Sequence, residues 1–76
     1  MKRLLLTGAS GNLGRMLAKR LTQAGYWLRL SDIAPFPDVM PENAEFIQAD
    51  LMDSGAHTAL VPGMDAILHF VCIRVS

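Results

Sequence analysis

The chain alternates between short apolar segments and amphipathic ones, and this pattern predicts four strands and two helices. Apolar runs of roughly four to eight residues bounded by glycine or other turn residues are typical of strands in parallel sheets. We expect strands at residues 3–7, 26–31, 45–49 and 64–71. Helices are expected over residues 12–24 and from Asp53 or Ser54 to about Val61. This alternation of strand and helix indicates a parallel α/β sheet.

The first predicted helix has one apolar face, made of residues at helical spacing: Leu13, Met16, Leu17, Leu21 and Ala24. We expect this face to pack on the sheet. The basic residues Arg15, Lys19 and Arg20 then carry ordinary surface charge, and Gly25 ends the helix. Residues 33–43 contain three prolines and form a loop, because proline removes a backbone donor and fixes φ.

These elements predict a partial Rossmann-like parallel sheet in the strand order 3-2-1-4, with one helix on each face. Right-handed crossovers place the helices on opposite faces, since the chain reverses direction across the sheet between the third and fourth strands. The fourth strand is then an unpaired edge. With 76 residues and no disulfide, we expect a marginal or aggregation-prone monomer, with self-association through that strand.

The turn between the first strand and the first helix has the spacing G-x-x-G-x-x-G, with glycines at positions 8, 11 and 14. Gly8 allows the tight turn, Gly11 lets the backbone approach a pyrophosphate, and Gly14 brings helix and strand together. The helix N-terminus then faces an anion, and no acidic side chain repels it. A purely structural turn is the alternative. The P-loop pattern is excluded, because the loop ends Leu13-Gly14-Arg15.

A carboxylate follows both the second and the third predicted strand. Asp32 stands where it can accept both ribose hydroxyls of an adenosine, which favours NAD over NADP, or it caps its loop. Asp50 is either a site residue or an Asx-turn. His69 is interpreted as a core histidine rather than a catalytic one, and His57 as a residue on the surface of the second helix.

Charge and composition narrow the class of protein. Residues 1–31 carry six bases and no acid, whereas residues 32–76 carry seven acids and one base. The bases are dispersed over several elements, so we expect no nucleic-acid partner. Cys72 is the single cysteine, which excludes an intramolecular disulfide, and no spacing indicates a zinc site. No apolar run approaches the ~18 residues of a membrane span or forms a signal peptide, so no membrane partner and a cytoplasmic setting are expected.

Four motifs in order resemble an extended short-chain dehydrogenase/reductase of the NAD-dependent epimerase/dehydratase family, with uronate dehydrogenases as the suggested relatives. They are Thr7–Gly14, Asp32-Ile33, Asp50-Leu51 and Gly63–His69. The resemblance implies NAD along the strand ends, with Asn12-Leu13 at the pyrophosphate, Asp32-Ile33 at the adenosine ribose and Asp50-Leu51 beside the adenine. The full set of expected cofactor-binding residues is Gly8, Ser10, Gly11, Asn12, Leu13, Gly14, Asp32, Ile33, Asp50 and Leu51.

Two features depart from the family pattern. Family members usually place two small residues after the histidine, whereas this chain has the bulky run Phe70–Arg74, which could obstruct the dinucleotide. The family's catalytic Tyr-x-x-x-Lys pair is absent, because the single tyrosine, Tyr26, is followed four positions later by Leu30. We therefore expect residues 1–76 to be the N-terminal part of an NAD(P)-binding domain, ended before the catalytic segment by a frameshift or a premature stop. No catalytic residue can be named.

Three hypotheses about function follow. The chain is the NAD-binding portion of an oxidoreductase or epimerase acting on a sugar-like substrate, and is inactive alone. Alternatively, it is a non-catalytic NAD-binding module, or an inert truncated product.

Overall fold

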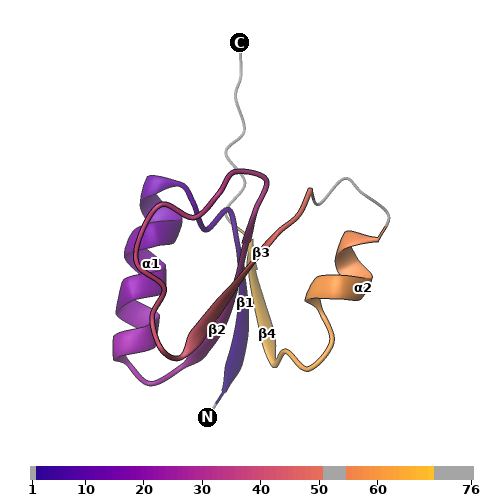
Figure 1. Ribbon diagram of the computed structural model, residues 1–76. Helices are drawn as coiled ribbons and strands as arrows, with labels where there is room; N and C mark the ends of the chain where they lie inside the picture. The colour runs from indigo at the N-terminus through magenta and orange to yellow at the C-terminus, as the bar shows by residue number, and fades with distance from the viewer. Residues whose placement is uncertain (1, 51–54, 70–76) are drawn as a thin grey trace.

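The structure, a computed structural model, describes residues 2–50 and 55–69 and contains one parallel sheet. Its strands are β1 (Arg3–Thr7), β2 (Trp27–Asp32), β3 (Ala44–Gln48) and β4 (Ala66–His69). Its helices are α1 (Asn12–Gln23) and α2 (Ala56–Leu60). The strand order is β3-β2-β1-β4, which confirms the predicted order, with β4 at one edge of the sheet (Figure 1).

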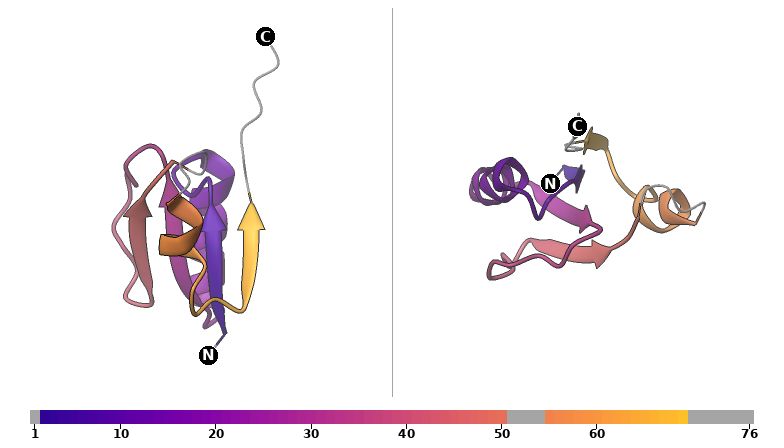
Figure 2. Two further views of the ribbon diagram at one scale, coloured as in Figure 1. Left: turned by 90° about the vertical axis from the view of Figure 1, so that its right-hand side faces the viewer. Right: turned by 90° about the horizontal axis from the view of Figure 1, so that it is seen from above.

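The two helices lie on opposite faces of the sheet, as the two views in Figure 2 show. Right-handed connections produce this arrangement whenever a chain reverses its direction across a parallel sheet. The prediction of one helix on each face is therefore confirmed.

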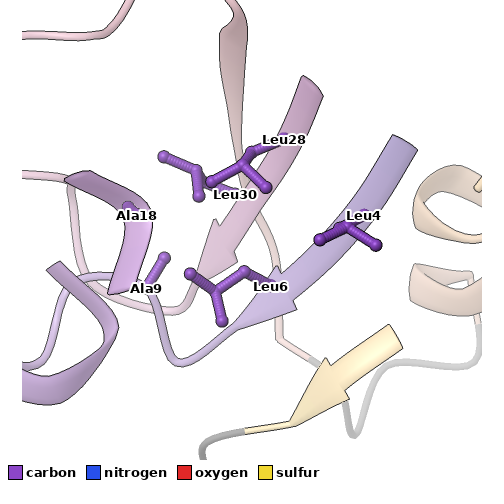
Figure 3. Packing of buried hydrophobic residues seen from close by; sticks show 6 residues of the cluster. All are labelled: Leu4, Leu6, Ala9, Ala18, Leu28 and Leu30. Atoms are coloured by element: carbon purple, nitrogen blue, oxygen red, sulfur yellow. The ribbon is translucent and has the colours of Figure 1, made fainter. Parts of the chain in front are cut away.

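Strand β1 lies between β2 and β4, and both faces of the sheet are covered at its position. Leu4 and Leu6 belong to the core under α1, and Leu5 belongs to the core under α2. The first core is completed by Ala9, Ala18, Leu28 and Leu30 (Figure 3). Alternate residues of one strand thus fill two separate cores, which explains why the run Leu4-Leu5-Leu6 is apolar without interruption.

The buried face of α1 differs from the prediction. The buried residues are Gly14 and Ala18, with Leu17 and Leu21 partly buried against the same core. Leu13 is 49% exposed and Met16 is 48% exposed, so their assignment to the sheet-facing side is wrong. Ala24, also assigned to that side, is exposed. Small residues allow the close helix–sheet approach, so the helix turns them inward and moves these larger side chains to its flank.

Strand β4 is more exposed than a buried strand would be. Ile67 is 39% exposed and His69 is an exposed residue, whose Nδ1 lies 2.9 Å from the Thr7 hydroxyl. The interpretation of His69 as a core histidine is therefore wrong. Among the described residues, its strand β4 has a single neighbouring strand, β1. The predicted helix start at Asp53 or Ser54, the strand end at 70–71 and Cys72 lie outside the described residues.

The side chain of Arg29 ties α2 to the sheet. It is 14% exposed and its Nε donates to Glu45 Oε1 on β3 over 2.7 Å. Its Nη1 donates to the carbonyl oxygens of Leu60 and Pro62, at 2.8 and 2.9 Å. The last carbonyl groups of a helix have no partner within it, and a nearby cation satisfies them. One guanidinium group thus joins β2, β3 and the end of a five-residue helix.

Within residues 2–50 and 55–69, no helix has the length and apolar character needed to cross a membrane. The same residues contain no group of three or more His, Cys, Asp or Glu side chains arranged to hold a metal ion.

Replacement of Arg29 by Met should destabilise the fold, because two carbonyl oxygens and the Glu45 carboxylate lose their donor. We expect Arg29→Met to lower the free energy of unfolding by about 1–3 kcal/mol, as measured by urea denaturation. Arg20→Met is the matched control, since it removes the same charge from an exposed position on α1. Equal losses in the two variants would contradict the bracing role of Arg29.

Candidate functional site

Three predicted site segments meet at one edge of the sheet. The segment after β1, the end of β2 and the segment after β3 all lie at the carboxyl ends of parallel strands. The Ala49 amide donates to the Asp32 carbonyl oxygen over 3.0 Å, which continues the ladder and places Asp50 beside the end of β2. Ligands of open α/β sheets bind at this edge.

The glycine loop, residues 8–14, leaves β1 through a tight turn. Gly8 has φ +69°, a conformation that favours glycine because a side chain would be strained there. The Gly11 amide donates back to the Gly8 carbonyl oxygen over 3.3 Å, and the Ala9 amide donates to the Ser31 carbonyl oxygen on β2 over 3.1 Å. The loop is thereby fixed to the neighbouring strand before the helix begins.

The N-terminus of α1 is open to a ligand. Gly11 is its N-cap residue and makes no side-chain capping hydrogen bond, and the first turn contains no acidic residue. The first amides of any helix lack partners within that helix. In α1 they belong to Asn12, Leu13 and Gly14, of which Asn12 and Leu13 are exposed. Free amides together with the positive end of the helix dipole suit an anionic group such as a phosphate.

The second and third glycines of the loop have different surroundings. A Cβ at Gly14 would collide with the Gly8 carbonyl oxygen and lie 2.8 Å from the Cα of Ala9. Both are backbone atoms, so helix and strand would have to separate. A Cβ at Gly11 would meet only the Gly8 carbonyl oxygen, at 3.6 Å, which is an ordinary contact. The fold therefore requires Gly14, whereas space at Gly11 remains for a molecule outside the chain.

Asp32 makes two hydrogen bonds from the end of β2. Its Oδ2 accepts from the Ser10 amide over 3.0 Å, and its Oδ1 accepts from the Ala34 amide over 3.1 Å. The second bond is the loop-capping interaction that the sequence left as an alternative. A carboxylate has about four lone-pair directions, so it can accept further donors. Loop capping and ligand binding are thus compatible at this residue.

The remaining predicted site residues also lie at this edge. Ile33 follows Asp32 and is 65% exposed, and Asp50 is exposed two residues after the end of β3. Leu51 lies outside the described residues, as does the bulky run after His69. The structure thus brings the glycine loop and Asp32 into direct contact, and Asp50 directly follows Ala49, whose amide bonds to the Asp32 carbonyl oxygen.

An ion pair that the sequence did not suggest holds the proline-rich loop against α1. Arg15 binds the Asp38 carboxylate with two nitrogens, at 2.8 Å from Nε and 2.7 Å from Nη2. The hydrogen bond from Arg15 lowers the pKa of Asp38 below its ordinary value, and the same hydrogen bond raises the pKa of Arg15. Arg15 is therefore a tether rather than a freely solvated charge, whereas Lys19 and Arg20 are exposed as expected.

Gln48 is a second residue that the sequence analysis missed. It ends β3, lies opposite Asp32 in the parallel register, and donates from Nε2 to the Ile33 carbonyl oxygen over 2.8 Å. Its position at the carboxyl end of a strand, two residues before Asp50, was the available signal.

The two glycine environments give a direct test. Gly14→Ala should lower the free energy of unfolding by about 1–3 kcal/mol because the added methyl group overpacks the helix–strand contact. Gly11→Ala is the matched control and should cost less than about 1 kcal/mol, the scale of an N-cap substitution. Urea denaturation of the two variants measures both values. An equal loss at both positions would contradict the difference in packing.

Comparison with known proteins also indicates a nucleotide-binding chain of the family that the sequence motifs resemble. The family model of the NAD dependent epimerase/dehydratase family matches residues 4–75. The chain is 50% identical over 68 residues to a uronate dehydrogenase of Pseudomonas putida, covering 90% of this chain and 25% of that protein. It is 47% identical to a uronate dehydrogenase of Agrobacterium fabrum, over 99% of this chain and 28% of the relative.

Solved structures show the same likeness. A mutant uronate dehydrogenase from Agrobacterium tumefaciens, complexed with NAD, has a TM-score of 0.83 at 47% identity. The match covers 99% of this chain and 28% of that one. A glucuronic acid dehydrogenase from Chromohalobacter salexigens has a TM-score of 0.82 at 34% identity, covering 97% of this chain and 27% of the other.

The chain thus spans about a quarter of the length of the curated relatives that it matches. The family match nevertheless covers nearly all of the chain and includes the glycine loop, Asp32 and the segment up to β4. The chain belongs to the NAD-dependent epimerase/dehydratase family.

Proposed function

We propose that this chain is the NAD-binding portion of an oxidoreductase or epimerase that acts on a uronate or a similar sugar acid. The observation that carries the proposal is the direct contact between the glycine loop and Asp32 at the carboxyl edge of the sheet. The substrate class rests on the relatives, which are named uronate dehydrogenases.

The residues present fit a dinucleotide. The uncapped N-terminus of α1 suits the pyrophosphate, and the space outside Gly11 allows it a close approach. The amides of Asn12 and Leu13 would donate to it. Gly8 and Gly14 would shape the loop rather than touch the cofactor, because their roles are a turn and a packing contact.

Asp32 would accept hydrogen bonds from the adenosine ribose hydroxyls and would repel a 2′-phosphate, which favours NAD over NADP. Ile33, Asp50 and Leu51 would lie near the adenosine end of the cofactor. These positions come from the resemblance and from the shared edge of the sheet.

Bound NAD would supply the hydride acceptor for oxidation of a substrate hydroxyl. Such a reaction also needs an acid or base at the substrate oxygen. The sequence contains no Tyr-x-x-x-Lys pair, since Leu30 stands four positions after Tyr26. The proposal therefore gives this chain a role in cofactor binding and assigns it no catalytic residue. A cytoplasmic setting stays a prediction that rests on the composition.

A calorimetric titration with NAD tests the proposal. We expect saturable binding by the chain, weakened at least about tenfold in Asp32→Ala, because a carboxylate that accepts ribose hydroxyls contributes roughly 1.5–3 kcal/mol. Glu42→Gln is the matched control, since it removes an exposed carboxylate from the loop before β3. Absence of heat up to millimolar NAD would identify an inert chain. Binding without dehydrogenase activity on uronates is expected, because the chain has no Tyr-x-x-x-Lys pair.

We also propose self-association through β4. Within the described residues this strand has a neighbour on one side only, and Ile67 on it is 39% exposed. An unpaired strand edge with apolar side chains is a template for pairing with another chain.

Sedimentation velocity tests the proposed edge pairing. We expect the sedimentation coefficient to rise with protein concentration and Ile67→Lys to abolish this rise, because a charge on an edge strand opposes pairing. Val39→Lys is the control, since it places the same charge at a loop residue that is 92% exposed. A single monomeric species at every concentration would contradict the proposal.

A further inference from the structure

The segment Ile33-Ala34, directly after β2, is held by hydrogen bonds at three successive backbone groups. The Ile33 carbonyl oxygen accepts from Gln48 Nε2 over 2.8 Å. The Ala34 amide donates to Asp32 Oδ1 over 3.1 Å. The Ala34 carbonyl oxygen accepts from the Ser10 hydroxyl over 2.9 Å. The side chains that hold this segment come from the glycine loop, β2 and β3, which are distant in sequence.

Apolar packing does not explain why the backbone of Ile33-Ala34 is held by so many hydrogen bonds. Ile33 is 65% exposed, Ala34 is exposed, and the hydrogen bonds from Ser10 and Gln48 are themselves exposed. An exposed loop can satisfy its backbone groups with water, so polar side chains are not needed to avoid a desolvation cost. The three bonds therefore fix the position of the segment rather than protect it from water.

One of these bonds and a fourth one, from the Ser10 amide, orient the carboxylate of Asp32. Its Oδ2 accepts from the Ser10 amide and its Oδ1 accepts from the Ala34 amide, so both oxygens are oriented by backbone donors. Ser10 contributes twice, because its amide binds Asp32 and its hydroxyl binds the carbonyl group of Ala34. If Ala34 moved, one of the two donors that orient the carboxylate would be lost.

We propose that Ser10 and Gln48 are positioning residues that brace Ile33-Ala34, orient the Asp32 carboxylate toward a ribose diol, and thereby set the preference for NAD over NADP. This inference rests on the proposed function. It gives Ser10 a role through Asp32 in place of the direct cofactor contact predicted from the sequence. It also gives a role to Gln48, which the sequence analysis did not select.

We call the hydrogen bonds from Ser10 and Gln48 to Ile33-Ala34 the brace. It affects the choice between NAD and NADP because the two cofactors require different positions of the Asp32 carboxylate. A ribose diol needs a carboxylate whose oxygens are already aimed, and preorganisation improves binding by reducing the ordering cost. A 2′-phosphate needs the carboxylate and the loop to move away from it. Loss of the brace should therefore weaken NAD binding and leave NADP binding unchanged or stronger, whereas general destabilisation weakens both.

The test compares dissociation constants for NAD and NADP in brace and control variants. In Ser10→Ala and in Gln48→Met, we expect the preference for NAD to fall about three- to tenfold, the effect of one hydrogen bond. Thr22→Ala is the control for Ser10, because it removes a hydroxyl that bonds the Ala18 carbonyl oxygen within α1. Gln23→Met is the control for Gln48, because Gln23 is exposed on α1. Ser10→Thr keeps the hydroxyl and should restore the preference.

A second measurement separates this inference from the proposed function. Amide hydrogen exchange of the chain without NAD should show protection at Ala34, reduced severalfold in Ser10→Ala and unchanged in Thr22→Ala. An unprotected Ala34 amide in the parent chain would overturn the brace itself. An unaltered ratio of the NAD and NADP dissociation constants in both brace variants would overturn its role in selectivity. No NAD binding by the parent chain, with Ala34 protected, would overturn the proposed function and the selectivity role but not the brace.

Discussion

The close approach of α1 to β1 at Gly14 is the constraint on which the site depends. A Cβ at this position would collide with the Gly8 carbonyl oxygen, so only glycine allows the observed distance. Because the helix starts against the end of β1, its free amides lie at the carboxyl edge of the sheet, beside the end of β2. A helix held farther out would present the same amides away from Asp32. The packing contact and the candidate cofactor site are therefore one structural feature.

The two cores of the sheet are covered by helices of different length. One face of the sheet is covered by α1, a 12-residue helix whose small residues Gly14 and Ala18 allow dense packing. The other face is covered by α2, a five-residue helix whose Ala56 and Leu60 pack against Leu5. Such a short helix contributes little apolar area, and the Arg29 guanidinium supplements it with hydrogen bonds to the carbonyl groups at its end. We infer that stability is concentrated on the α1 side, where the candidate site begins.

Polar contacts dominate the outer part of the site, beyond the packed helix and strands. Asp32, Ser10 and Gln48 order the segment after β2, and the Arg15–Asp38 ion pair ties the following proline-rich loop to α1. Apart from the bond between Asp32 and the nearby Ala34 amide, these contacts join elements that are far apart in the sequence. The adenosine end of a bound dinucleotide would thus meet a surface shaped by hydrogen bonds rather than by apolar burial.

The pattern of apolar runs and glycines was sufficient to predict four strands, their order, and a glycine loop beside Asp32 at the carboxyl ends of the strands. In a small α/β chain, short uninterrupted apolar runs form strands that are buried on both faces. The glycine spacing indicates a turn whose backbone conformation other residues rarely adopt. Which side of α1 is buried depends on its packing against the sheet. Helical periodicity weighs large apolar residues, whereas close packing selects small ones, so Leu13 and Met16 are exposed. The exposure of His69 and the hydrogen bonds to Asp32 also depend on the tertiary structure. Neither the edge position of a strand nor a long-range hydrogen bond produces a periodic pattern in a sequence.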